Sequence, residues 1–93
     1  MTDVRMTRLI RCWHEQAATL AGAVERSAGT RGWTETVGAF AEASEAFGER
    51  ELSVAVRAAE RAAPGDRVRI ARALRGAATR TARRSLDRDA SAA

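Results

Sequence analysis

The apolar residues in the N-terminal third of the chain are spaced alternately four and three positions apart: Met6, Ile10, Trp13, Ala17, Leu20 and Val24. At about 100° per residue, this spacing places them on one narrow face of an α-helix. Charged residues such as Arg8 and Glu15 fall on the opposite face. Because Asp3 can cap this helix and Gly29 can end it, the pattern predicts a helix over residues 3–28.

A second apolar stripe with the same spacing comprises Trp33, Val37, Phe40, Ser44 and Phe47. Thr30 or Thr34 can cap its helix. The stripe loses its phase after Gly48, and a new one comprises Leu52, Ala55, Val56, Ala59 and Ala63. Glycine is the usual residue just past a helix end, so we expect a break or sharp kink at Gly48. The pattern predicts helices over residues 31–47 and 49–63, and the alternative is one long, kinked helix.

The sequence Pro64-Gly65-Asp66 marks the next boundary, because a regular helix does not continue through Pro-Gly and aspartate is a good N-cap. The apolar side of the helix that follows comprises Ile70, Leu74, Ala77, Ala78 and Thr81. This predicts a last helix over residues 66–86, with a frayed tail from about residue 87. We therefore expect an all-α fold, a small helical bundle of about four short helices in one domain, residues 1–93; three helices with a long kinked second helix are the alternative.

Large apolar side chains are few. Leucine, isoleucine, valine and phenylalanine together number 15 of 93 residues, or about 16%, and alanine is the commonest residue. A domain this small is marginal even with an ordinary core. The composition therefore predicts a folded domain with a thin core, and it favours association with a second copy or with another protein.

The seven arginines between residues 65 and 85 are the most conspicuous charged feature. On a helix beginning at Asp66, five of them share an arc roughly 140° wide, while Arg67 and Arg84 flank the apolar side. These five are Arg69, Arg72, Arg75, Arg80 and Arg83. The segment from Pro64 onward carries eight arginines and three aspartates, a net +5, whereas residues 31–48 carry one arginine and three glutamates, a net −2. All 16 basic residues of the chain are arginine, so a GC-rich coding bias can account for part of this content.

Three interpretations of this arginine stripe remain open. It can be a solvated helix surface, although such surfaces normally include glutamates. It can bind acidic groups of another subunit or protein, for which forked arginine bonds are well suited. It can bind nucleic acid phosphates without sequence preference, but both tryptophans are expected in the core, where they cannot stack on bases. Our prediction is a protein-interaction module that uses these arginines, with Val54, opposite Leu52 on its helix, as a further contact residue.

Catalytic and metal-binding patterns are missing from the sequence. The only cysteine and histidine, Cys12 and His14, are two residues apart on a helix and point about 160° away from each other, so they cannot form a dyad. Glu42 and Glu45 fall on the solvent side, and the chain lacks a His pair, a Cys pair and a Glu-x-x-His motif. We expect no enzymatic activity, cofactor, metal or small-molecule substrate.

The sequence contains no apolar run approaching the ~18 residues of a membrane span, and no continuous apolar stretch follows the N-terminal arginines, as it would in a signal peptide. The expected location is the cytoplasm, with no membrane partner.

Trp13 and Trp33 lie on apolar stripes on either side of the Gly29–Gly32 turn, and their simplest role is packing between the first two helices. A helical hairpin with tryptophan at the turn, in an alanine-rich chain of this length, also resembles the WXG100 type VII secretion substrates over at most the first two-thirds of the chain. This chain departs from the family at its turn, since Trp33-Thr34-Glu35 lacks the glycine of Trp-x-Gly. It also has no tyrosine for the family's C-terminal signal.

Overall fold

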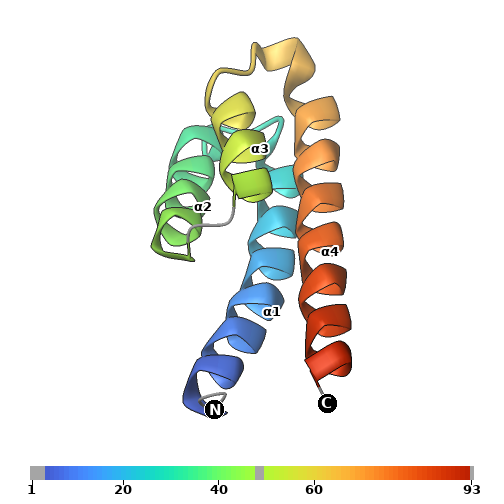
Figure 1. Ribbon diagram of the computed structural model, residues 1–93. Helices are drawn as coiled ribbons and strands as arrows, with labels where there is room; N and C mark the ends of the chain where they lie inside the picture. Colours follow the sequence, from blue (N-terminus) through green and yellow to red (C-terminus); the bar gives the residue numbers. More distant parts are fainter. Residues whose placement is uncertain (1–3, 48–49, 93) are drawn as a thin grey trace.

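The computed structural model describes the backbone of residues 4–47 and 50–92, and this part of the chain forms four α-helices and no strand. The helices are α1 (Val4–Ser27), α2 (Trp33–Phe47), α3 (Arg50–Glu60) and α4 (Arg67–Ala92), with a short 3₁₀ turn, η1 (Pro64–Asp66), before α4. The predicted all-α bundle of about four helices is confirmed. Each helix packs against its neighbours in the chain, and α4 also packs along α1 (Figure 1).

The molecule is elongated, measuring 46 Å by 18 Å by 18 Å. The two long helices α1 and α4 run side by side in opposite directions, and the shorter α2 and α3 cover only part of their length (Figure 1). The beginning of α1 and the end of α4 therefore lie together at one end of the molecule, beyond the end of α2.

A single core connects the four helices, and it is as thin as the composition indicates. Its largest fully buried apolar side chains are Phe40, Leu52, Leu74, Val24, Val37 and Val56. Alanines fill much of the remaining space, including Ala17 and Ala21 of α1 and Ala71 of α4. The buried hydroxyl groups of Ser44 and Thr81 donate hydrogen bonds to backbone carbonyls one turn earlier in their own helices, at about 3.0 Å. These bonds satisfy hydroxyl groups that would otherwise be costly to bury.

The aromatic residues confirm that α1 and α2 pack through their apolar stripes. Trp13 is buried, contacts Phe40 edge-on and stacks against Phe47. Trp33 begins α2 and is buried as well, with the guanidinium carbon of Arg67 5.3 Å from its ring centroid. The Arg67 side chain, at the start of α4, therefore reaches the first residue of α2 through a cation–π contact, although the described residues of the two helices do not pack against each other.

Several predictions about the apolar stripes were wrong in detail. Met6 is 54% exposed and Phe47 44% exposed, because α2 ends before it can cover the first turns of α1. Ile10 is only half-buried, and Ala63 is exposed because α3 ends at Glu60. Leu20 is half-buried too, but it packs against the core as its place in the stripe predicts.

The boundaries near the last helix also differ from the prediction. Asp66 does not act as the N-cap of a helix over residues 66–86; it belongs to η1, and its carboxylate forms an ion pair with Arg69 at 3.4 Å. The helical backbone of α4 continues to Ala92, through the segment expected to fray. Gly48, the predicted break, lies outside the described residues, but the helices on its two sides are separate, ending at Phe47 and beginning at Arg50.

Candidate interaction surface

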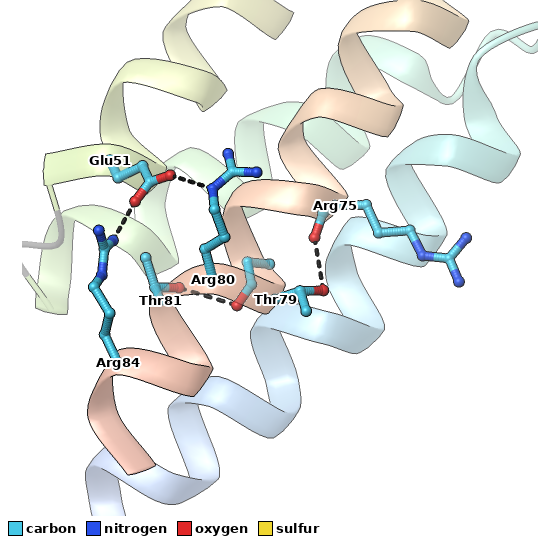
Figure 2. A network of polar contacts seen from close by, with 7 residues as sticks. Glu51, Arg75, Thr79, Arg80, Thr81 and Arg84 are labelled. Carbon is cyan, nitrogen blue, oxygen red and sulfur yellow. Dashed lines mark hydrogen bonds and ion pairs between the residues drawn. The ribbon is translucent and has the colours of Figure 1, made fainter. Parts of the chain in front are cut away.

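The arginines of α4 do not all share the same surroundings. Arg75 extends toward α1, where its Nη1 lies 3.1 Å from Oε2 of Glu25. Arg80 and Arg84 turn the other way and converge on the single carboxylate of Glu51 at the start of α3, as Figure 2 shows. The predicted stripe is therefore divided, because its members bond to different helices.

The double contact at Glu51 changes the properties of that carboxylate. The Nε of Arg80 donates a hydrogen bond to Oε1 at 2.8 Å, and Nη2 of Arg84 donates one to Oε2. Both bonds favour the ionised form, so the pKa of Glu51 is lowered from its ordinary value of 4.5, against a smaller opposing effect of desolvation. Glu51 links α3 to α4, and it engages Arg84, which the sequence pattern had placed beside the apolar side.

Two of the predicted site residues stay outside this network. Arg72 and Arg83 are exposed, and no ion pair of either is found among the described residues. Arg69 is 74% exposed in its side chain and pairs with Asp66 within its own turn. The exposed surface of α4 therefore keeps positive charge that the carboxylates of Glu25, Glu51 and Asp66 do not neutralise.

A shallow groove runs between α1 and α4 beside these arginines. The groove consists of two adjoining hollows, and the Glu25–Arg75 ion pair lines both of them. The first hollow is completed by Ala18, Thr19, Gly22 and Arg26, and the second by Arg72, Gly76, Thr79 and Arg80. The groove has a floor of small side chains and a rim with four arginines and one glutamate, so it is suited to an anionic partner.

Val54, the remaining predicted contact residue, lies on a different surface. It is 62% exposed on α3, whereas Leu52 on the opposite side of that helix is fully buried. Val54 does not line the groove between α1 and α4. The structure thus brings Arg72, Arg75 and Arg80 together at one groove and leaves Val54 apart from it.

Positive charge extends from α4 onto α3. Residues 50–86 contain ten arginines and three acidic residues, a net +7, whereas residues 4–47 contain five of each. Arg50, Arg57 and Arg61 are all exposed along α3 or directly after it. One half of the bundle is strongly basic and the other half is neutral, a separation that favours recognition of an anionic surface.

Residues with potential for other chemistry are spread apart. Cys12 is exposed and His14 is half-buried on α1. The described residues contain no group of three or more histidine, cysteine, aspartate or glutamate side chains that could hold a metal ion. Among the same residues, none of the helices has the length and apolar character needed to cross a membrane.

The fold and its surface define a small four-helix bundle with one arginine-rich helix. Comparisons of this chain with protein-family models, curated proteins and solved structures gave no match.

Proposed function

We propose that this protein is a non-enzymatic interaction module that binds an acidic surface, on another subunit or another protein, through the arginines of α4. The proposal depends most on one observation: Arg72 and Arg83 are exposed on α4, and no carboxylate among the described residues pairs with them, although Glu25 and Glu51 pair with their neighbours. Like charges three and four residues apart destabilise a helix by a few tenths of a kcal/mol. A carboxylate partner would relieve that repulsion.

The internal ion pairs support this function by positioning the groove. Arg75 is held toward α1 and Arg80 toward α3, which leaves the hollow around Gly76 and Thr79 open between them. Each guanidinium has five donors, so a pair with one carboxylate leaves further donors for a partner. Because these side chains are already oriented, less conformational entropy is lost on binding.

Nucleic acid is the second candidate, favoured by the net +7 of residues 50–86. Both tryptophans are buried, so neither offers an aromatic platform for bases. Binding of this kind would be directed at phosphates, would not depend on base sequence and would weaken strongly with salt.

The test is the double variant Arg72→Glu/Arg83→Glu, compared with Arg31→Glu/Arg61→Glu. The second variant has the same net charge, and its two changes are at exposed residues outside α4. Solution mass is measured by sedimentation at two salt concentrations, and binding is measured to a glutamate-rich helical peptide and to a mixed-sequence DNA duplex.

The proposed function predicts that only the α4 variant loses self-association or peptide binding, with its helical content unchanged. Reversing a charge at a buried interface pair typically costs 2–5 kcal/mol. Comparable DNA-binding losses in both variants would support general charge attraction, whereas a loss confined to the α4 variant would support the nucleic acid function. If mass and all binding stayed unchanged, the arginines would be only a solvated helix surface.

A further inference from the structure

The first hollow of the groove is lined by residues of both α1 and α4. They are Ala18, Thr19, Gly22, Glu25 and Arg26 of α1 and Arg75 of α4. Arg26 is exposed, and no ion pair of Arg26 is found among the described residues. Arg75 points from α4 toward α1, as Figure 2 shows, and pairs with Glu25. The hollow therefore has a guanidinium group on each of its two walls.

A glycine one turn before Arg26 allows its guanidinium to lie close to the helix. Nη1 of Arg26 is 3.3 Å from the position that a Cβ atom on Gly22 would occupy. The same pattern, Gly-Ala-x-x-Arg, recurs at residues 76–80 of α4, where Nη1 of Arg80 is 3.3 Å from the corresponding position on Gly76. A Cβ atom at either glycine would force the guanidinium to shift. Each hollow therefore has an arginine whose donors lie low, beside a glycine.

The hydroxyl groups that line the groove are already used as donors. Thr19 donates a hydrogen bond to the backbone carbonyl of Glu15 at 3.2 Å, and Thr79 donates one to that of Arg75 at 3.1 Å. Among the side chains lining the two hollows, the donors left for a ligand belong to arginines. These are Arg26, Arg72, Arg75 and Arg80. The groove is therefore built to recognise an anion rather than a neutral polar ligand.

The groove keeps a positive charge after its ion pairs are counted. Its two hollows are lined by four arginines and one glutamate, a net +3. If Glu51 is included, which bonds to Arg80 from outside the hollows, the net charge is +2. An anion is attracted to such a groove, and one with two charges is attracted more strongly than one with a single charge.

The position of Glu25 indicates which anion the first hollow accepts. Its carboxylate oxygen is 3.1 Å from Nη1 of Arg75, and its side chain is only 28% exposed, so one carboxylate is already in place. A carboxylate of a partner has the same charge as Glu25 and gains little by competing with it. A phosphate monoester carries about −1.5 to −2 charges and has three acceptor oxygens, so it can accept bonds from two arginines at once.

We infer that the first hollow binds a phosphate monoester, carried by a phosphorylated serine or threonine of the partner protein, with Arg26 and Arg75 as its donors. This inference rests on the proposed function, because it names the group of the acidic partner that enters the groove. Arg72 and Arg83, farther along α4, stay available for carboxylates beside the phosphate. A phosphodiester of nucleic acid has one charge per phosphate and is the weaker ligand for this hollow.

The probes are three peptides of one glutamate-flanked sequence, with phosphoserine, glutamate or serine at the central position. Binding is measured by the fluorescence anisotropy of a label on the peptide, at about pH 7.5, where most of the monoester is dianionic. We expect the phosphoserine peptide to bind the parent at least about tenfold more tightly than the glutamate peptide does.

Arg26→Gln/Arg75→Gln removes both donors of the first hollow. We expect this variant to bind the phosphoserine peptide at least about tenfold more weakly than the parent, with its helical content unchanged. The matched control is Arg11→Gln/Arg57→Gln, which loses the same charge at exposed residues of α1 and α3 outside both hollows. We expect the control to change the affinity by less than about threefold, since those charges are screened by salt.

Glu25→Gln distinguishes ligand binding from a purely structural role of the ion pair. It frees Arg75 and makes the hollow more positive by one charge, so the affinity for the phosphoserine peptide should rise by about threefold or more. Glu15→Gln makes the same charge change at an exposed residue of α1 outside both hollows, and it should leave the affinity nearly unchanged. If Arg75 only supported the fold, loss of its partner would not strengthen binding.

Competition identifies the source of the phosphate. The inference predicts that unlabelled phosphoserine peptide displaces the probe at concentrations where inorganic phosphate and a DNA duplex do not. Equal displacement by inorganic phosphate would overturn the assignment to a phosphorylated partner, and equal displacement by DNA would assign the hollow to nucleic acid. If the glutamate peptide binds as tightly as the phosphoserine peptide, the inference falls and the proposed function stands. If none of the three peptides binds, the inference is overturned and the proposed function loses support as well.

Discussion

The rings of Trp13 and Phe47 lie parallel, with their planes 6° apart and their centroids separated by 4.7 Å. Trp13 comes from the middle of α1, and Phe47 is the last residue of α2. The stack therefore closes the core at the point where the bundle changes from four helices to two. One ring is buried and the other is 44% exposed, so the two residues should contribute unequally to stability.

Replacing Trp13 with alanine should destabilise the fold by roughly 3–5 kcal/mol, the usual cost of truncating a large buried aromatic side chain. In a thin core this is a large share of the total free energy of unfolding. Phe47→Ala should cost less, since part of its ring is already in water. Urea denaturation followed by circular dichroism gives both values, and a Trp13→Ala variant as stable as the parent would contradict the described core.

Acid should weaken the contact between α3 and α4 through Glu51. Arg80 and Arg84 lower the pKa of Glu51 below its ordinary value of 4.5 in the folded protein. The contribution of the ionised Glu51 to the free energy of unfolding is therefore fully present above that ordinary pKa. It is lost as the pH falls through the lowered pKa. We expect Glu51→Gln to be less stable than the parent at neutral pH, with the difference shrinking below about pH 4.

Thermal unfolding between pH 7 and pH 3 measures that difference. The control is Glu15→Gln, an exposed residue for which no ion pair is found among the described residues. Glu15→Gln should change the melting temperature only slightly, and by a similar amount at every pH between 7 and 3. A Glu51→Gln difference that grows toward acid would show that the two arginines do not stabilise the ionised carboxylate.

The cation–π contact between Arg67 at the start of α4 and Trp33 at the start of α2 should contribute to the stability of the fold. Arg67→Gln is expected to cost about 1 kcal/mol, because it removes a charge that is 5.3 Å from the ring centroid and half-buried. Arg69→Gln, two residues later, removes a largely exposed ion pair and should cost less than about 0.5 kcal/mol. Equal effects of the two changes, measured by urea denaturation, would argue against the contact with Trp33.

Gly38 lies inside α2, and a Cβ atom added there would meet nothing within 4 Å. Gly38→Ala should therefore raise stability by about 1 kcal/mol, the difference in helix propensity. At Gly76 the added Cβ would lie 3.3 Å from Nη1 of Arg80, which must shift, so Gly76→Ala should gain less. The melting temperatures provide the comparison, and a loss of stability at Gly38 would show that α2 is placed incorrectly.

The fold class and the approximate positions of the helices could be predicted from the sequence because they depend on local periodicity and on breakers such as Pro64-Gly65. The exposure of Met6 could not. Periodicity indicates which side of α1 faces the core, but coverage of that side depends on how far α2 reaches after the chain has turned. The end of α4 was also missed, since residues beyond 86 carry alternating charges and no apolar stripe that would indicate a helix.

For the candidate surface, the sequence predicted which arginines of α4 point outward, but not which of them pair with other helices. The spacing of residues along α4 correctly placed Arg72 and Arg83 on its exposed side, because the direction of a side chain around a helix axis follows from spacing alone. The partners of Arg75 and Arg80 come from other helices, so they depend on packing. The sequence does contain a signal for these two glutamates. Glu25 directly follows the core residue Val24, and Glu51 directly precedes the core residue Leu52, so both lie beside a helix interface where an arginine of another helix can reach them.

The side-by-side packing of α1 and α4 makes the order of the helices circular. Each helix touches the next, and the last touches the first, with the start of α1 and the end of α4 at the same end of the molecule (Figure 1). The architecture therefore does not depend on where the chain begins. If the termini were joined by a short glycine-serine linker and the chain reopened in the turn at Gly29–Gly32, synthesis would begin with α2 and end with α1. Such a permuted chain should reach the same bundle, because every helix keeps both of its neighbours.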